Sequence, residues 1–268
     1  MRFASLGSGS KGNGTLVEWR DTCVLVDCGF SLRESTHRLG RLGCHPEQLT
    51  AILVTHEHGD HLRGVWPLAR RFRIPVMMTA GTALAAGLVG DGSAIARNAI
   101  GDTASVDLRL IEGDREFGVG DLGVMPVPVP HDAREPVQFV FSSARHRFGL
   151  LTDLGSITQH VVASYGQCDG LLLEANHDIA MLAEGGYPPA LKRRVGGSWG
   201  HLNNAQAAAF LGAVDRSRLQ TLVLGHISQH NNLPERVAET VARRTKGIHR
   251  VAYACQDMGF PWLFLEAH

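Results

Sequence analysis

The sequence predicts an α/β fold in which two β-sheets pack face to face with helices on the outside. Two observations predict it. Short apolar, β-branched runs alternate with turns along the chain, and two successive halves each pass from strands to helices. No proline- or serine-rich linker separates the halves. We therefore expect residues 1–268 to form a single domain.

The first half alternates short apolar runs with helical segments. Runs of four to six apolar and β-branched residues, bounded by glycine or aspartate, are typical of strands. Longer segments with apolar residues spaced three and four apart are typical of helices. The expected strands are residues 2–7, 15–19, 22–29, 50–56 and 74–80. The expected helices are residues 31–43, 61–72 and 81–90.

The second half begins with strands and continues with alternating helices and strands. The same two patterns define its elements. The expected strands are residues 105–111, 115–119, 122–129, 136–143, 146–153, 170–176, 220–226, 251–254 and 262–267. The expected helices are residues 157–166, 203–214 and 234–246.

Composition excludes several classes of protein. Apolar residues make up 44% of the chain and charged residues 19%, which are ordinary globular values. The apolar runs are far shorter than the roughly 18 residues of a membrane span, and the N-terminus lacks a signal-peptide core, so we expect a cytoplasmic protein without membrane contact. Five cysteines without a C-x-x-C pair argue against disulfides and a thiolate zinc site. The 26 basic and 26 acidic residues balance, so any affinity for phosphate must be local.

The stretch VTHEHGDH, residues 54–61, places three histidines and two carboxylates directly after the apolar run AILV. A zincin helix is excluded, because H-E-x-x-H requires a second histidine where this chain has Asp60. Gly59 also disfavours a continuous helix. An abrupt turn would instead direct His56 and His58 to one ion, and Asp60 and His61 to another. Imidazole and carboxylate ligands suit zinc, manganese or iron.

A pair of ions needs more ligands than this motif supplies, and other strand ends offer them. His131, Asp153 and His226 each follow an apolar run. Taken singly, a histidine or aspartate at a strand end is more often a cap or turn residue. Their shared context instead indicates a rim of loops around one pocket.

Ordered as H-x-H-x-D-H, then His, Asp and His, these residues resemble the ligand set of the metallo-β-lactamase superfamily. The resemblance implies an αββα sandwich of two mixed sheets and two divalent ions, with zinc favoured over manganese or iron. An aspartate rather than a cysteine at the bridging position resembles the hydrolases of the superfamily, not the true β-lactamases. By this resemblance His56, His58 and His131 hold one ion, Asp60, His61 and His226 hold the other, and Asp153 bridges them.

Further motifs narrow the branch. The segments SLGSGSKGNGT, EANHD, YPPALKRRV, GHLNN and LGHISQHNN are similar, in order, to the YycJ/WalJ group of phosphodiesterases and exonucleases, which is related to tRNase Z. Asp153 follows His131 by 22 positions, which leaves no room for a tRNase Z arm. His226 follows Asp153 by 73 positions, too few for a β-CASP insertion.

The resemblance implies a dinuclear metal-dependent phosphodiesterase that acts on DNA or RNA, and favours an exonuclease. Metal-bound hydroxide would attack phosphorus, and Asp60 would orient or deprotonate the water. His201 would support the scissile phosphate and protonate the leaving group, unless it is only a residue preceding a helix. Asp27 would orient a ligand histidine, or is a turn residue. A glyoxalase II-like thioester hydrolase and a metal-stabilised module without turnover are the alternatives.

Substrate contacts are expected from three segments. The glycine-rich loop at residues 7–14 offers Ser10, Lys11 and Asn13 to a phosphate, although a plain hairpin turn fits the same sequence. Lys192, Arg193 and Arg194 would meet flanking phosphates, although a run of three cations is usually only a solvated helix end. His177 either lines the pocket or, with its neighbours, caps the helix that follows it.

Overall fold

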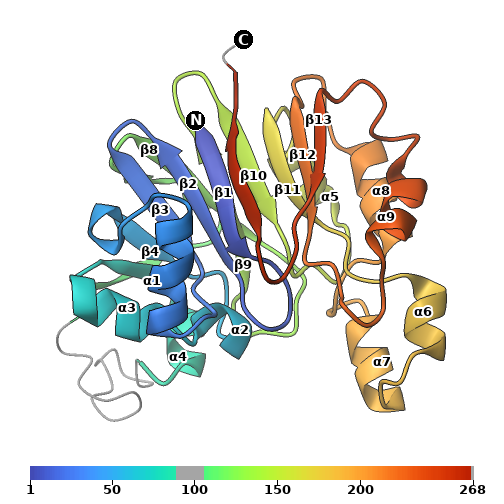
Figure 1. The fold of residues 1–268 in the computed structure, drawn as a ribbon, viewed down its shortest axis with the longest axis horizontal. Helices are drawn as coiled ribbons and strands as arrows, with labels where there is room; N and C mark the ends of the chain where they lie inside the picture. Colours follow the sequence, from blue (N-terminus) through green and yellow to red (C-terminus); the bar gives the residue numbers. More distant parts are fainter. Residues whose placement is uncertain (89–105, 267–268) are drawn as a thin grey trace.

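The described residues, 1–88 and 106–266 of this computed structural model, form two seven-stranded sheets that lie face to face (Figure 1). The predicted sandwich with helices outside is confirmed. The first sheet has the order β14 (Phe260–Phe264), β1 (Arg2–Gly7), β2 (Gly14–Trp19), β3 (Thr22–Val26), β4 (Ala51–Leu53), β5 (Val76–Thr79) and β6 (Leu108–Ile111). The second has the order β13 (Arg250–Tyr253), β12 (Thr221–Gly225), β11 (Gly170–Glu174), β10 (Arg147–Leu151), β9 (Val137–Ser142), β8 (Leu122–Pro128) and β7 (Phe117–Val119).

Both sheets are mixed, and within each sheet the parallel strands are neighbours. Strands β3 to β6 run parallel in the first sheet, and β10 to β13 run parallel in the second. Leu172 on β11 pairs with Leu150 and Val223 on its two neighbours. The carboxyl ends of these strands therefore meet at one edge of each sheet, where ligands bind in open α/β sheets.

Helices cover the outer faces of the sandwich, and alternation along the strands separates the core into layers. On β2, Val17 packs between the sheets while Leu16 packs under the helices. The inner layer includes the stacked rings of Phe3 and Phe148, whose centroids are 4.2 Å apart. The helices are α1 (Leu32–Arg41), the 3₁₀ turn η1 (Pro46–Gln48), α2 (Gly59–Leu62), α3 (Val65–Phe72), α4 (Ala80–Ala85), α5 (Gln159–Ser164), α6 (Ile179–Glu184), α7 (Pro189–Val195), α8 (Asn204–Ala213) and α9 (Pro234–Val241).

Two helical segments differ from the sequence prediction. The helix expected at residues 61–72 is split into α2 and α3 at Gly64. A Cβ atom at this glycine would lie 1.9 Å from the carbonyl oxygen of Phe30, so the chain passes too close for any side chain. The helix α7 was not predicted. In Figure 1, α7 lies at the lower right and α2 at the lower centre.

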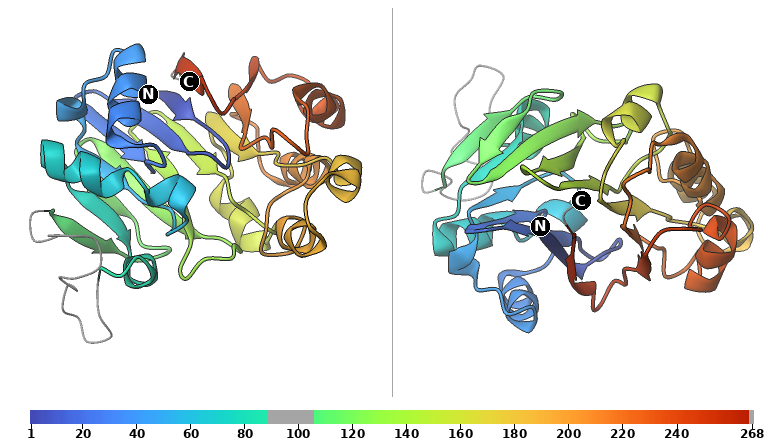
Figure 2. Two further views of the ribbon diagram at one scale, coloured as in Figure 1. Left: turned by 60° about the horizontal axis from the view of Figure 1, so that its bottom comes forward. Right: turned by 90° about the horizontal axis from the view of Figure 1, so that it is seen from above.

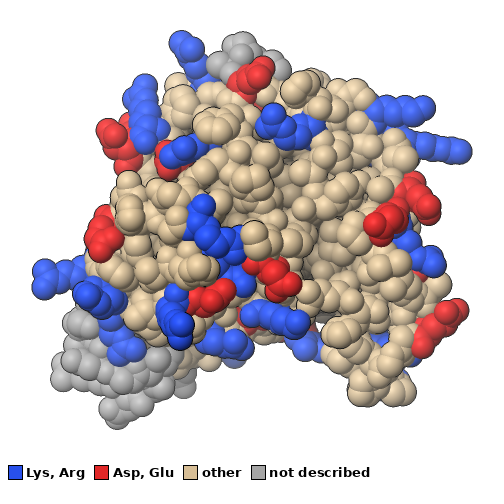
Figure 3. Space-filling view, viewed as in Figure 1, with Lys and Arg blue, Asp and Glu red and all other residues tan. Residues whose placement is uncertain are grey.

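The surface follows the composition of the chain. Lysine, arginine, aspartate and glutamate side chains are interspersed over the face drawn in Figure 3, without a broad area of one sign. The first and last strands, β1 and β14, are paired side by side, as the views of Figure 2 show. Among the helices of residues 1–88 and 106–266, none has the length and apolar character that crossing a membrane requires.

Candidate metal centre

The residues that follow the parallel strands turn abruptly toward the space between the sheets. Asp27 follows β3, Asp153 follows β10 and His226 follows β12, with φ angles of 60°, 51° and 53°. Left-handed backbone is uncommon outside glycine, although aspartate and histidine adopt it more readily than most residues. Each turn directs a polar side chain inward from a rigid strand end. Unusual backbone of this kind concentrates at functional sites.

Three histidines form the first group of candidate metal ligands, the first donor group. His56 Nε2 lies 3.0 Å from His58 Nδ1, which lies 3.3 Å from His131 Nε2. Donors at zinc–nitrogen distance in a tetrahedron are separated by about 3.3 Å. The three nitrogen atoms therefore have the spacing of ligands around one ion.

The other ring nitrogen of each histidine has a partner that fixes the ring. His56 Nδ1 lies 2.9 Å from Thr55 Oγ1, and His131 Nδ1 lies 3.0 Å from the carbonyl oxygen of Gly200. His58 Nε2 lies 3.2 Å from the carbonyl oxygen of Asp132. Such contacts set the tautomer and orientation of metal-binding histidines.

The second donor group lies beside the first. Asp60 Oδ2 and Asp153 Oδ2 lie 3.5 Å and 3.4 Å from His61 Nε2, and His226 completes the group. Asp153 also groups with His56, so it lies between the two sets. Asp153 Oδ2 and His226 Nε2 are buried and have no hydrogen-bond partner among the described residues. Buried polar atoms require partners, and a bound cation would supply both. The donor set therefore fits two divalent ions.

Two buried carboxylates orient the second group. Asp27 Oδ2 lies 2.8 Å from His61 Nδ1 and also accepts the hydroxyl of Thr55. Glu174 Oε1 lies 2.8 Å from His226 Nδ1 and 2.9 Å from His201 Nδ1. Asp27 was a sequence prediction, whereas Glu174 was not predicted. The signal for Glu174 was its charge at the end of the apolar run LLLE.

Burial and mutual contact control protonation in the centre. Burial, reinforced by the neighbouring His61, His131 and His58, lowers the pKa of His56 well below its usual value, so the ring is neutral and keeps a free lone pair. Burial also lowers the pKa of His226, but Asp153 and Glu174 outweigh it and raise the value to about 9. The uncompensated negative charge of the carboxylates thus attracts protons, and it would attract cations in the same way.

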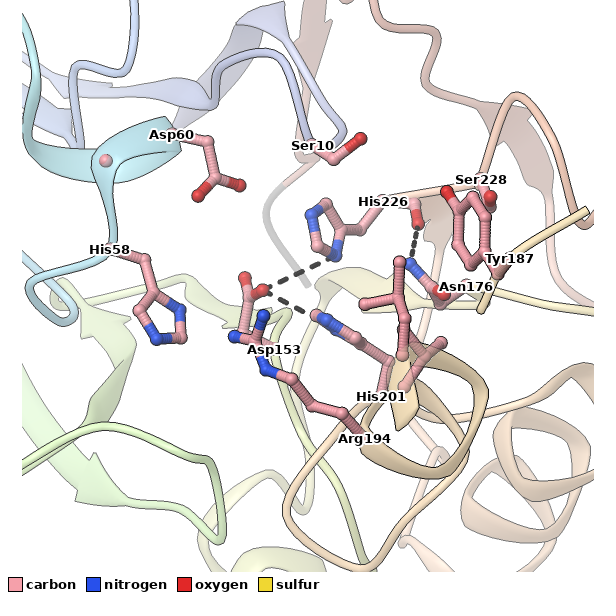
Figure 4. A pocket seen from close by; sticks show the side chains of 13 residues that line it. Ser10, His58, Asp60, Asp153, Asn176, Tyr187, Arg194, His201, His226 and Ser228 are labelled. Carbon is pink, nitrogen blue, oxygen red and sulfur yellow. Dashed lines mark hydrogen bonds and ion pairs between the residues drawn. The ribbon is translucent and has the colours of Figure 1, made fainter. Parts of the chain in front are cut away.

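His201 extends from the loop between α7 and α8 and lines the cavity. Its neighbour Asn203, not His201, caps α8 by accepting the backbone N–H of Gln206. Figure 4 shows the ring beside Asp153, on the opposite side of the pocket from His58. Its Nδ1 atom is held by Glu174, which leaves the remainder of the ring directed at the site.

A cavity of about 420 Å³ opens over both donor groups (Figure 4). Its wall is formed by loops that follow strands of both sheets, by the start of α2 and by α7 with its flanking residues. The lining residues are Ser10, His58, Gly59, Asp60, Asp153, Asn176, Tyr187, Leu191, Arg194, Val195, His201, His226 and Ser228.

The predicted substrate contacts are only partly brought to this cavity. Ser10 lines it, while Lys11 is exposed outside it. Asn13 is buried beneath it, where its Nδ2 donates to Asp60 Oδ2 at 3.2 Å. This amide positions a predicted catalytic carboxylate instead of facing substrate.

Of the three successive basic residues on α7, only one lines the cavity. Lys192 donates to the carbonyl oxygen of Ala183, Arg193 is exposed, and neither lines the cavity. Arg194, the third cation of the run, does line it and pairs with Asp132. His177 is buried below the wall, and its neighbour Asp178 caps α6.

The fold and this cluster define a two-layer hydrolase scaffold with a histidine- and aspartate-rich metal centre. The Beta-lactamase superfamily domain matches residues 22–227, and the chain belongs to the metallo-β-lactamase superfamily. It is 33% identical over 235 residues to exodeoxyribonuclease WalJ of Streptococcus pneumoniae, covering 88% of this chain and 84% of that protein. It is 29% identical over 243 residues to exodeoxyribonuclease YycJ of Bacillus anthracis, covering 91% and 88%.

A solved structure shares the fold over nearly the whole chain. Zn²⁺-bound PqqB from Methylobacterium extorquens superposes with a TM-score of 0.74 and 16% identity, covering 99% of this chain and all of that one. The predicted resemblance to the superfamily and to the YycJ/WalJ group is confirmed by these similarities.

Proposed function

We propose that this protein is a metal-dependent phosphodiesterase that removes nucleotides from the end of a DNA strand. One observation carries the proposal: seven histidine and aspartate side chains from loops after four strands group at the floor of one open cavity, and four of them line it. The full-length similarity to two exodeoxyribonucleases supports nucleic acid as the substrate and favours DNA over RNA.

We propose two zinc ions as the cofactor. His56, His58 and His131 would hold one ion, Asp60, His61 and His226 would hold the other, and Asp153 would contact both. Nitrogen and carboxylate donors without a thiolate suit zinc, and manganese or iron is the substitute that the same donors accept. Bound there, the ions supply positive charge that acidifies water and neutralises a phosphate.

The residues of the chain divide the remaining work. Asp60, fixed by the amide of Asn13, faces the cavity and orients the attacking water. His201 faces the scissile phosphate and gives a proton to the departing oxygen, while Glu174 fixes its ring through Nδ1. A positioned general acid of this kind contributes about 10² to 10⁴ in rate. Arg194 adds positive charge at the cavity wall, and Ser10 offers a hydroxyl donor on the opposite side.

A single-domain organisation over residues 1–268 is also part of the proposal. The 22 positions from His131 to Asp153 contain only β9, β10 and their turns. The 73 positions from Asp153 to His226 contain α5, β11, the three helices α6 to α8 and β12. Neither interval contains a separate domain or a long arm, so the cavity is bordered by the core fold itself.

The decisive experiment uses protein loaded with zinc or manganese and its measured metal content. Single-stranded DNA and RNA of one sequence, labelled at either end, are incubated with it, with lactoylglutathione as a thioester control. Stepwise release of mononucleotides from DNA is the expected result. Hydrolysis of the thioester alone, or of no phosphodiester by protein carrying two ions per chain, would contradict the proposal.

A further inference from the structure

The helix α7 presents apolar side chains to the cavity instead of to the core. None of its seven residues, all within the described part of the chain, is buried. Leu191 and Val195 lie four positions apart, hence on one side of the helix, and both line the cavity. Tyr187, just before the helix, lines it too. Among the described residues, none of these three side chains belongs to a core cluster. The apolar side of α7 therefore has no structural partner that explains it.

Tyr187 lies across the cavity from two of the proposed metal ligands. Figure 4 shows Tyr187 beside Asn176 and Ser228, across the pocket from His58 and Asp60. The tyrosine ring is half-buried and meets the imidazole of the exposed His230 edge-on, at 6.2 Å between centroids. A partly exposed aromatic ring held in place next to a phosphoryl site is a platform for a planar ligand.

The same helix also brings a cation to the cavity. Arg194 lines the pocket and is held by Asp132, the residue that follows His131. The seven-residue helix and the tyrosine before it thus offer a positive charge and an apolar, aromatic surface to one cavity of about 420 Å³. That volume lies at the small end of the roughly 300–1,000 Å³ usual for small-molecule pockets. A nucleotide has the matching two parts, an anionic phosphate and a planar, largely apolar base.

We infer that Tyr187, Leu191 and Val195 form a subsite for the nucleobase attached to the scissile phosphate. The inference rests on the proposed phosphodiesterase activity and specifies how that site selects its substrate. Stacking on Tyr187 would hold a single unpaired terminal nucleotide, because a base paired within a duplex does not expose its face.

Three chromogenic phosphodiesters test the subsite, since they share one leaving group and differ in whether a nucleoside is attached to the phosphate and through which of its oxygens. They are the p-nitrophenyl esters of thymidine 5′-phosphate and thymidine 3′-phosphate, and methyl p-nitrophenyl phosphate. In each, water adds to phosphorus and p-nitrophenolate departs. We expect kcat/KM for one thymidine ester to exceed that for the methyl ester by about five- to a hundredfold, the range for one base–aromatic stack. We expect Tyr187→Ala to remove most of this preference and Tyr187→Phe to keep it.

The methyl ester is the internal reference for folding and for the metal centre, because it carries no base: the ratio of thymidine ester to methyl ester hydrolysis, compared between variants, reports on the subsite. Trp199→Ala is the matched control, since Trp199 is 63% exposed near α7 yet lies outside the cavity lining. Equal hydrolysis of all three esters by wild type, or loss of the thymidine preference in Trp199→Ala but not in Tyr187→Ala, would overturn the subsite while leaving the phosphodiesterase intact. Failure to cleave any of the three would instead count against the proposed function.

Discussion

Glu174 links more parts of the candidate centre than any motif residue does. It is fully buried, and its carboxylate contacts the rings of His201 and His226. It also accepts the backbone N–H groups of Asp153, Leu154 and Leu202 at 2.9 to 3.2 Å. A buried charge is tolerated only when its hydrogen bonds are satisfied, and here every contact belongs to a loop of the site.

Replacing Glu174 with glutamine should therefore damage the fold as well as the site. The amide would present N–H groups where backbone N–H donors already point, and it would leave the imidazoles without a charged partner. We expect Glu174→Gln to lower the free energy of unfolding by about 3–5 kcal/mol, measured by urea denaturation. Glu184→Gln makes the same change at an exposed position of α6 and should stay within about 0.5 kcal/mol of wild type. Equal stability of the two variants would refute the role assigned to Glu174.

A variant of His201 distinguishes a catalytic role from a role as metal ligand. If it is the general acid, His201→Ala should reduce kcat by about 10²- to 10⁴-fold on an unactivated strand while two ions per chain remain bound. Elemental analysis of the purified variant checks the metal content, and His37→Ala on the exposed surface of α1 is the control. A variant that lost its metal would show that His201 is a ligand instead.

The sequence predicts the candidate metal ligands better than it predicts the residues that hold them in place. The candidate ligands could be found because each follows an apolar strand, and the dense motif at residues 54–61 is rare by chance. Their assignment to individual ions stays a prediction. The contacts of Glu174 with His201 and of Asp132 with Arg194 could not be predicted, because they join residues 27 and 62 positions apart. No local pattern records such pairings.

The loop after β3 packs directly against the metal-binding motif at residues 54–61. A Cβ atom on Gly29 would lie 1.7 Å from the carbonyl oxygen of Asp60, and the backbone N–H of Cys28 donates to the carbonyl oxygen of His61. The start of α2 is therefore fixed by packing against this loop.

Gly29→Ala should displace the motif. We expect a loss of stability of about 1–3 kcal/mol with a matching loss of bound metal, measured by denaturation and elemental analysis. Gly40→Ala lies inside α1, and its Cβ would meet nothing within 4 Å among the described residues. This control should gain about 0.5–1 kcal/mol and keep its metal. An unchanged metal content in Gly29→Ala would show that the loop does not position α2.

The elements that sequence patterns predicted are those that pack on the core. Each strand alternates or is uniformly apolar because it contacts one or both layers of the sandwich. The helix α7 was missed for the converse reason. It contains Pro189 and three successive cations, and its two apolar residues four positions apart, Leu191 and Val195, are too short a pattern to indicate a helix. A helix that does not pack on the core need not have regularly spaced apolar residues, so a search for that spacing does not find it.

For the whole molecule, bound ions should add to stability. The two donor groups join loops from both sheets, and ions bind the folded arrangement but not the separated side chains of the unfolded chain. At a free metal concentration 100 times the dissociation constant, the gain is about 2.7 kcal/mol per site. We expect chelator to lower the melting temperature and stoichiometric zinc to restore it. Identical melting curves with and without chelator, together with no retained metal, would rule out the centre.

Zero net charge also predicts how the molecule meets a nucleic acid. Basic and acidic side chains are mixed on the face in Figure 3, and within the described residues Arg194 is the single lysine or arginine that lines the cavity. Binding should then involve about one to three phosphates near α7, so that affinity for a single strand falls with a log–log salt slope between about −0.7 and −2.

We therefore expect KM for an oligonucleotide to rise by no more than about twentyfold between 50 and 200 mM salt. Arg194→Ala should flatten the slope by about one phosphate contact, whereas Arg71→Ala on α3, away from the cavity lining, should leave it unchanged. The measurement is KM at four or more salt concentrations with a fixed strand. A thousandfold change would indicate a long phosphate-binding track, which a protein gripping only the last nucleotides of a strand does not need.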